Sequence, residues 1–181
     1  ATSTLGAENL NPVEYVGGVE LTHLGLLFDS LVMRDLQGKL VPGLATKWAA
    51  RENGKVWDFE LRKGVKFHNG DTFTAKDVKF TYDLIPKAKG TNSITIARYL
   101  DSVEVVDDYK VTVKLNKPFG PFLITYGSLI VPKDYFEKVG PEGFVKNPVG
   151  TGPFRLVNRR INESMEFEAF EECWKQVPSI K

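Results

Sequence analysis

The sequence predicts an α+β fold, a mixed arrangement in which short helices alternate with antiparallel strand pairs. Three observations predict it. Apolar residues recur at helical spacing between residues 18 and 31. They alternate with charged residues between 56 and 62, as in a half-buried strand. Between 103 and 115, two runs rich in valine flank an Asp-Asp pair, a pattern typical of two strands joined by a turn.

The first predicted helix covers residues 18–31 (GVELTHLGLLFDSL). Its apolar side chains share one face, and core packing is the interpretation that this spacing favours. These side chains are Leu21, Leu24, Leu27, Phe28 and Leu31.

A strand and a capped helix come next. In residues 56–62 (VWDFELR), three apolar side chains point to one side and three charged ones to the other. The helix runs from Thr74 to Leu84, with Thr74 as its N-cap. Its predicted helical face consists of Val78, Thr81, Tyr82 and Ile85.

The stretch LRKGVKFHNGDTFTAKDV, residues 61–78, has residue types that would suit a metal loop, a phosphate cradle or plain turns. His68 has no second ligand at i+2 or i+4, and the alternating oxygen ligands of a calcium loop are missing. Asn69-Gly70 supplies the positive φ that a tight turn needs. We therefore interpret the stretch as two turns, with His68 as a turn residue.

The second half of the chain continues the α+β pattern. A short helix is expected at 119–126 and another at 132–139, where Pro132 stands at the helix start. Residues 154–170 are expected to form a hairpin with its polar bend near 158–164.

Composition favours a globular domain and gives no reason to expect nucleic acid. The 181 residues are 42% hydrophobic, and 24 Lys+Arg face 23 Asp+Glu for a formal charge of +1. Such a balance does not attract nucleic acid or an anionic membrane. No apolar run approaches the roughly 20 residues that span a bilayer, so we expect no membrane span. The chain starts ATSTLGAENLNP, without an initial Met or a basic-then-apolar leader, which fits a processed or trimmed chain.

No catalytic constellation stands out. Ser128 and Cys173 lack a local base pattern, no G-x-S-x-G motif occurs, and the lone cysteine cannot form an internal disulfide. Gly150-Thr151-Gly152 is followed by Pro153 and a strand, whereas a phosphate cradle needs a helix N-terminus. We interpret it as a turn with positive φ or tight packing. The expectation is no catalytic residue, no metal site and no cofactor.

Two loops could form a binding surface. Glu14-Tyr15-Val16-Gly17-Gly18 precedes the first helix, and its glycine pair exposes backbone groups to a ligand. Thr125-Tyr126-Gly127-Ser128-Leu129 combines an aromatic ring, a hydroxyl and free backbone. A plain flexible turn or loop explains either segment equally well.

Several motifs in one order closely resemble family 5 of the extracellular solute-binding proteins, the dipeptide-, oligopeptide- and nickel-binding receptors of ABC importers. The longest is VPGLATKWAARENGKVWDFELRKGVKFHNGDTFTAKDVKFTYDLI, residues 41–85. The family usually has an acidic-Tyr-Trp triplet where this chain has Glu172-Cys173-Trp174. The other motifs are LNPVEY (10–15), LFDSLV (27–32), SVEVVDDYKVTVKLNKPFGPFL (102–123), IVPKDYFEKVG (130–140) and NPVGTGPFRLV (147–157).

This resemblance implies a periplasmic-binding-protein-like fold of type II, of which the chain holds part of lobe I with its inserted subdomain. Residues 1–40 would be the first segment of lobe I, 41–146 the inserted subdomain, and 147–181 the return strands. Family members run far longer, so the second lobe is expected to be absent from this chain.

The resemblance also implies a function. The chain would be the substrate-binding component of an ABC importer, which captures a peptide or similar small solute and delivers it to a membrane permease, and which catalyses no reaction. Localisation would be periplasmic or on the outer face of the cell envelope, with lipid anchoring left open. Cleft-facing contacts are expected from Tyr15, Val16, Gly17 and Gly18, and from Tyr126, Gly127 and Ser128. The alternatives are a sugar or metal-chelate receptor of the same family, and a hydrolase using Ser128 or Cys173.

We predict that the 181-residue chain alone binds ligand weakly or not at all, because a ligand of such receptors is enclosed between two lobes. Calorimetry against a peptide library measures this. Micromolar or tighter binding by the isolated chain would contradict the prediction.

Overall fold

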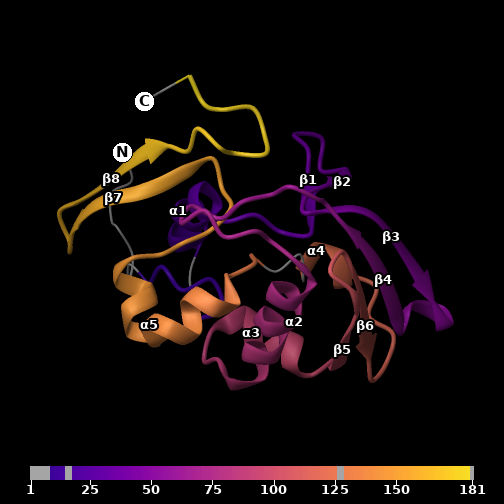
Figure 1. Ribbon diagram of the computed structural model, residues 1–181. Coiled ribbons are helices and arrows are strands. Elements are labelled where there is room, and N and C mark those ends of the chain that lie inside the picture. Colours follow the sequence, from indigo (N-terminus) through magenta and orange to yellow (C-terminus); the bar gives the residue numbers. More distant parts are fainter. Residues whose placement is uncertain (1–8, 15–17, 126–128, 180–181) are drawn as a thin grey trace.

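The computed structural model describes residues 9–14, 18–125 and 129–179 (Figure 1). Buried apolar side chains gather in two clusters. One lies beneath a four-stranded antiparallel sheet, at the right of Figure 1, and the other surrounds the first helix. This confirms the mixed α+β class that the alternating patterns predict.

The sheet consists of β3 (Ala45–Arg51), β4 (Val56–Leu61), β5 (Leu100–Asp107) and β6 (Lys110–Leu115) in the order β3-β4-β6-β5. A 3₁₀ turn at Glu52–Gly54 joins the first two strands. Alternation along each strand decides which face is covered. The covered face includes Phe59, Leu61, Val103, Val111, Val113 and Leu115, all buried.

Helices cover this apolar face. The second helix, α2 (Ala75–Leu84), packs on β5 and β6, and a 3₁₀ turn at Ile85–Lys87 leads from it to α3 (Thr91–Ala97). The predicted face of α2 is buried as expected, at Val78, Thr81, Tyr82 and Ile85.

A short helix, α4 (Phe122–Thr125), closes one end of the sheet. It brings the Phe122 ring to a centroid distance of 5.2 Å from Trp57 and 6.4 Å from Phe59. Offset aromatic contacts at such distances add to the apolar area that the rings bury.

The helix α2 is tied to the chain around the start of α5 (Lys133–Lys146). The backbone N–H of Thr74 donates to the Asp77 carboxylate at 2.9 Å, as in a capping box, and the Lys133 N–H donates to its other oxygen at 2.9 Å. Thr81 Oγ1 accepts from the Val131 N–H at 3.1 Å. Burial raises the pKa of Asp77, and the N–H donors of Lys133 and Thr74 oppose the shift.

The second cluster forms where α1 (Gly18–Leu27), α5 (Lys133–Lys146) and the hairpin β7 (Phe154–Arg160) to β8 (Ser164–Ala169) meet. α5 is interrupted at Gly140, which has a φ of 69° and is followed by Pro141. Residues of α1 and α5 share this cluster. The predicted border of the inserted subdomain at residue 146 stays a prediction. The buried members of the cluster are Leu10, Leu24, Leu27, Phe28, Val131, Phe136 and Phe144.

A small hairpin and a glycine segment surround the end of α1. The hairpin pairs β1 (Val32–Arg34) with β2 (Leu40–Pro42). The segment Gly150–Gly152 crosses the last turn of α1, where the Gly152 N–H donates to Leu27 O at 2.9 Å. A Cβ at Gly150 would lie 2.0 Å from the same carbonyl oxygen. Of the two explanations that the sequence left for these glycines, tight packing is the one the structure supports.

The first helix is shorter than the sequence predicts. Its last backbone hydrogen bond joins the Phe28 N–H to Leu24 O at 2.8 Å. The chain then becomes extended, and Ser30 forms an isolated antiparallel β-bridge with Leu129. Phe28 and Leu31 are buried outside the helix, whereas Leu21 is 45% exposed. The apolar spacing therefore identified core residues correctly except for Leu21, and it placed the helix end too late.

The turn interpretation of residues 61–78 is confirmed. Gly64 and Gly70 have φ angles of 74° and 88°, and the backbones of Lys66 and Thr72 form an isolated antiparallel β-bridge. The apolar residues between the turns, Val65 and Phe67, are fully buried.

We predict that Gly150→Ala lowers the free energy of unfolding by about 2 kcal/mol or more, because its methyl group would overlap the Leu27 carbonyl oxygen. Gly25→Ala is the matched control. Gly25 lies within α1 with open space around its Cβ position, so this variant should gain up to about 1 kcal/mol. Urea unfolding measures both, and equal stability of the two variants would refute the close-packing explanation.

Candidate functional site

Most of the predicted ligand-contacting residues fall outside the described part of the chain. The residues outside it are Tyr15, Val16 and Gly17 of the first loop and Tyr126, Gly127 and Ser128 of the second. Gly18 is described, and it is the exposed first residue of α1. The geometry of the site is therefore built from the residues that flank the two segments.

The flanks lie near the two ends of α1. Glu14 comes before the helix, and Gly18 begins it. Beyond the other end, Ser30 bridges Leu129, and the Ile130 N–H donates to Asp29 O at 3.0 Å. A helix of ten residues is about 15 Å long. The structure thus sets the flanks of the two predicted loops at opposite ends of one helix, of which Leu24 and Leu27 are buried.

Asp29 is a buried carboxylate at the end of α1. It is 2% exposed, and its Oδ2 accepts from Thr151 Oγ1 at 3.1 Å and from Trp174 Nε1 at 2.8 Å. The ammonium of Lys175 forms an ion pair with Oδ1. A buried carboxylate is costly unless it is paired and hydrogen-bonded, and Asp29 is both.

The segment after β8 is fixed by the same contacts. Besides its bond to Asp29, Trp174 stacks under the Arg62 guanidinium, whose Cζ is 4.4 Å from the ring centroid. Arg62 Nε in turn donates to Gly43 O at 3.2 Å. These contacts join the C-terminal segment to the start of the sheet.

His68 holds the glycine segment in place. Its Nδ1 accepts from the Gly150 N–H at 3.2 Å, and its Nε2 lies 3.0 Å from Gly152 O. Since Nδ1 accepts, the proton sits on Nε2 and is donated to Gly152. Burial lowers the pKa of His68, and the bond to Gly152 opposes this only in part. The ring therefore acts as a neutral structural bridge with both nitrogens in use.

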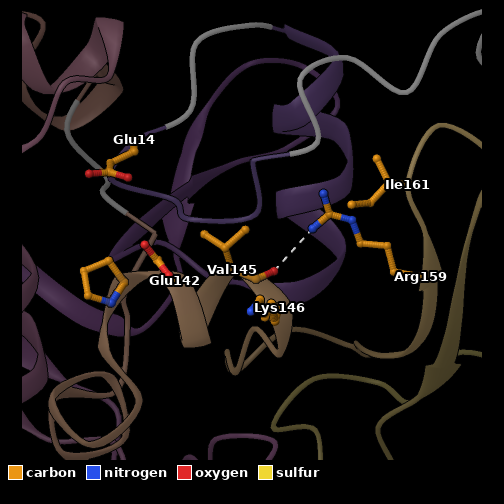
Figure 2. A pocket seen from close by; sticks show the side chains of 7 residues that line it. Glu14, Glu142, Val145, Lys146, Arg159 and Ile161 are labelled. Atoms are coloured by element: carbon orange, nitrogen blue, oxygen red, sulfur yellow. Dashed lines mark hydrogen bonds between the residues drawn. The ribbon is translucent and has the colours of Figure 1, made fainter.

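A pocket of about 600 Å³ lies beside Glu14 (Figure 2). In this view Glu14 and Glu142 stand on one side and Arg159 on the other, with the guanidinium donating to Val145 O at 3.3 Å. The volume and the mixture of charges suit a small solute that carries groups of both signs. The lining consists of Glu14, Pro141, Glu142, Val145, Lys146, Arg159 and Ile161.

The described residues give little basis for catalysis or metal binding. Among them, no three His, Cys, Asp or Glu side chains gather as metal ligands would. Burial raises the pKa of the Cys173 thiol, which opposes the thiolate that a nucleophile needs. In the same part of the chain, no helix combines the length and apolar character that crossing a bilayer requires.

Sequence reasoning missed the contacts made by Asp29, His68 and Lys175. Each joins residues more than 80 positions apart, and a local pattern carries no trace of such a pairing. The Glu172-Cys173-Trp174 triplet was the one visible signal, because it marked Trp174 as part of a recurring motif.

Comparison with known proteins gives one consistent result. Residues 39–181 match the family described as bacterial extracellular solute-binding proteins, family 5 Middle. The dipeptide-binding protein of Escherichia coli K12 is 32% identical over 167 residues, which cover 78% of this chain and 31% of that protein. The chain thus spans about a third of the length of this relative.

Solved structures agree with the sequence match. NikZ from Campylobacter jejuni in complex with Ni(L-His) superposes with a TM-score of 0.80 at 31% identity, over 92% of this chain and 34% of NikZ. The periplasmic binding protein DppA from Helicobacter pylori in complex with peptide STSA also gives 0.80, at 28% identity, over 92% of this chain and 38% of DppA. These likenesses support the expected periplasmic-binding-protein-like fold.

We predict that His68 makes stability fall as the pH decreases. The native ring resists protonation, so only the unfolded chain takes up a proton as the pH drops through the usual histidine pKa of about 6.5. The contribution is complete above that pH and is lost toward the lower native pKa, with a slope of at most about 1.4 kcal/mol per pH unit.

Urea unfolding at about pH 7.5 and about pH 5.5 measures this slope, since histidines titrate in that range and carboxylates mostly do not. His68→Gln should be less stable at the higher pH and should lose less stability on acidification. Equal pH dependence of the two proteins would contradict a buried neutral His68.

Proposed function

Because the chain belongs to the bacterial extracellular solute-binding proteins of family 5, we propose that it works in solute uptake. In this proposal it captures a peptide or similar small solute for an ABC importer and delivers it to the membrane permease. The supporting observation is the family match over residues 39–181 together with the same fold in relatives that hold bound solutes. The protein would act in the periplasm or on the outer face of the cell envelope.

We propose that the solute lies against the two loops at the ends of α1. Val16, Gly17 and Gly18 would offer backbone N–H and C=O groups, as extended peptides require. Tyr15 would stack on the solute. The buried attachment of the flanking residues supports this assignment, since a binding site needs a rigid support.

At the other end of α1, Tyr126 would stack, and Gly127 and Ser128 would add polar contacts. The pocket beside Glu14 supports the first of the two ends as a place where part of a solute fits. The second lobe would close over this surface by hinge motion. In that arrangement residues 1–40 and 147–181 belong to lobe I, and 41–146 to its inserted subdomain.

A metal chelate is the second candidate solute. One observation favours it, the likeness to NikZ, which was crystallised with Ni(L-His). A chelate carries its own ligands, so a receptor can hold it through the organic part without a cluster of protein ligands. The scarcity of histidine, two in the whole chain, therefore argues against a bare metal ion more than against a chelate.

A hydrolase remains the least supported alternative. It would need an activated Ser128 or Cys173, and the raised pKa of Cys173 works against the second. His68, one of two histidines, already uses both ring nitrogens in structural bonds.

We predict that the full-length gene product, purified without denaturation, carries a co-purifying peptide or chelate that native mass spectrometry detects. Calorimetry should then show binding of trialanine or of the Ni(II)–L-histidine complex. As a control, protein unfolded in guanidinium and refolded should lose the retained mass and still bind the added probe. A protein that retains nothing and binds neither probe would contradict the proposed function.

A further inference from the structure

The pocket beside Glu14 brings together three separate parts of the chain (Figure 2). Glu14 precedes α1, residues 141–146 form the second half of α5, and Arg159 and Ile161 lie at the end of β7. Its volume of about 600 Å³ lies in the range of pockets that hold small solutes. Figure 2 shows Glu14 and Glu142 on one side and the Arg159 guanidinium on the other, so the pocket has an acidic side and a basic side.

The backbone that carries the Glu14 carboxylate is fixed in place. Its N–H donates to Asn11 O at 3.0 Å. The preceding carbonyl, Val13 O, accepts a hydrogen bond from the buried Ser93 hydroxyl of α3. Gly90, the N-cap residue of α3, leaves room for this contact, since a Cβ there would lie 2.9 Å from the Glu14 Cα. The carboxylate therefore extends from a backbone that is held by its own turn and by α3.

Glu142 lines the pocket with its carboxylate on the same side as Glu14 (Figure 2). Glu142 and Lys146 stand four residues apart on α5, in the order that usually forms an ion pair on a helix. Lys133 and Glu137 do pair at this spacing in the first half of α5, at 2.7 Å. Within the ranges that the structure describes, neither Glu142 nor Glu14 has a hydrogen bond or an ion pair at its carboxylate. Both acidic groups are therefore available to a ligand.

Two carboxylates on one side of a pocket favour a cation there, because like charges repel each other and an opposite charge relieves the repulsion. An ammonium group suits this place, since it carries one positive charge and three N–H donors. A metal ion suits it less. Across the residues that the structure describes, no group of three His, Cys, Asp or Glu side chains gathers as metal ligands would. The acidic side of the pocket is thus better matched to an organic amine.

The basic side of the pocket has a guanidinium that is held in place. Arg159 Nη1 donates to Val145 O, near the end of α5, at 3.3 Å. The planar shape of a guanidinium matches that of a carboxylate. Lys146 also lines the pocket and adds a second positive charge, while Val145 and Ile161 add apolar surface. A solute in this pocket would therefore meet acidic, apolar and basic groups.

We propose that this pocket binds a zwitterionic solute by its two charged ends. The carboxylates of Glu14 and Glu142 accept hydrogen bonds from the ammonium group of the solute, and Arg159 faces its carboxylate. A short peptide with free termini, such as trialanine, has this chemistry. The proposal rests on the proposed function, because it takes the captured solute as the occupant of the pocket. It also favours a peptide over a metal chelate, since an amino group that coordinates a metal ion is no longer an ammonium.

Three variants of the full-length gene product test the ammonium site. Glu14→Gln and Glu142→Gln each remove one negative charge and keep the size of the side chain. The matched control is Glu171→Gln, since Glu171 is exposed and does not line the pocket. The Tm of each variant shows whether it is folded.

Calorimetry should give a Kd for trialanine that rises about 10-fold or more in the two pocket variants, as expected for a lost hydrogen bond to a charged group. In Glu171→Gln the Kd should change less than about 2-fold, because salt screens an exposed charge outside the pocket. N-acetyl-trialanine has no ammonium group. It should bind the unsubstituted protein about 10-fold more weakly than trialanine does, and its Kd should be the same in the two pocket variants.

The carboxylate end of the solute has a test of its own. Arg159→Gln should raise the Kd for trialanine about 10-fold or more. It should leave unchanged the Kd for trialanine amide, which has no carboxylate. A Kd that rises equally for both probes would reflect a change in the shape of the pocket and would overturn the role of Arg159.

A failure of this proposal differs from a failure of the proposed function. If the pocket variants bind trialanine with the Kd of the unsubstituted protein, or if only the Ni(II)–L-histidine complex binds, the ammonium site is wrong and the proposed function stands. An equal rise of the Kd for N-acetyl-trialanine in the pocket variants also overturns the site. If the unsubstituted protein binds neither trialanine nor the complex, the proposed function fails and the ammonium site falls with it.

Discussion

The crossing of Gly150–Gly152 over the last turn of α1 is the contact on which the rest of the arrangement depends. The Gly152 N–H donates a hydrogen bond to Leu27 O, one of the carbonyls that a helix end leaves unpaired. Both glycines lie so close to this helix end that a Cβ would overlap its carbonyl groups. His68 then holds both glycines from the other side. Three segments that are distant in sequence meet at one point, and the two apolar clusters are joined there.

Asp29, just beyond the end of α1, links a further segment of the chain to this crossing. Its carboxylate accepts hydrogen bonds from Thr151 in the crossing segment and from Trp174 in the segment after β8. It also forms an ion pair with Lys175 in that second segment. Because a charge this deeply buried is tolerated only with all its partners present, the contacts stabilise one another. Removal of one partner would leave the carboxylate under-satisfied and loosen the others. The end of α1 is thereby joined both to the crossing segment and to the segment after β8.

Local patterns predicted the elements well because their physical causes are local. The alternation in β4 follows from a period of two, and the start of α2 from the Thr74–Asp77 pair three residues apart. The end of α1 could not be predicted in this way. Helical spacing continues through Phe28 and Leu31, and the helix stops because Asp29 and Ser30 pair with Leu129 and Ile130, about 100 residues away.

At the candidate site, too, local sequence features could be predicted and contacts between distant residues could not. Glycine-rich composition singled out the loop at 14–18, and the family resemblance added its role. The hydrogen bond from the Ser93 hydroxyl to Val13 O could not be predicted, because a serine in the first turn of α3 is equally compatible with a solvent-facing position. Burial of its hydroxyl becomes evident only when both segments are placed in space.

We propose that loops supported by α1, at 15–18 and 126–128, let one fold serve different solutes. NikZ and DppA share this fold at the same TM-score of 0.80, although one was crystallised with Ni(L-His) and the other with a peptide. The contacts of Asp29 and His68 fix the end of α1 to distant segments and do not involve the residues proposed to touch the solute. Fold alone therefore cannot specify the solute, which must be read from the groups that touch it. In the proposed site those groups would belong to the loops at 15–18 and 126–128, so substitutions there could change the solute while the contacts of Asp29 and His68 stay intact.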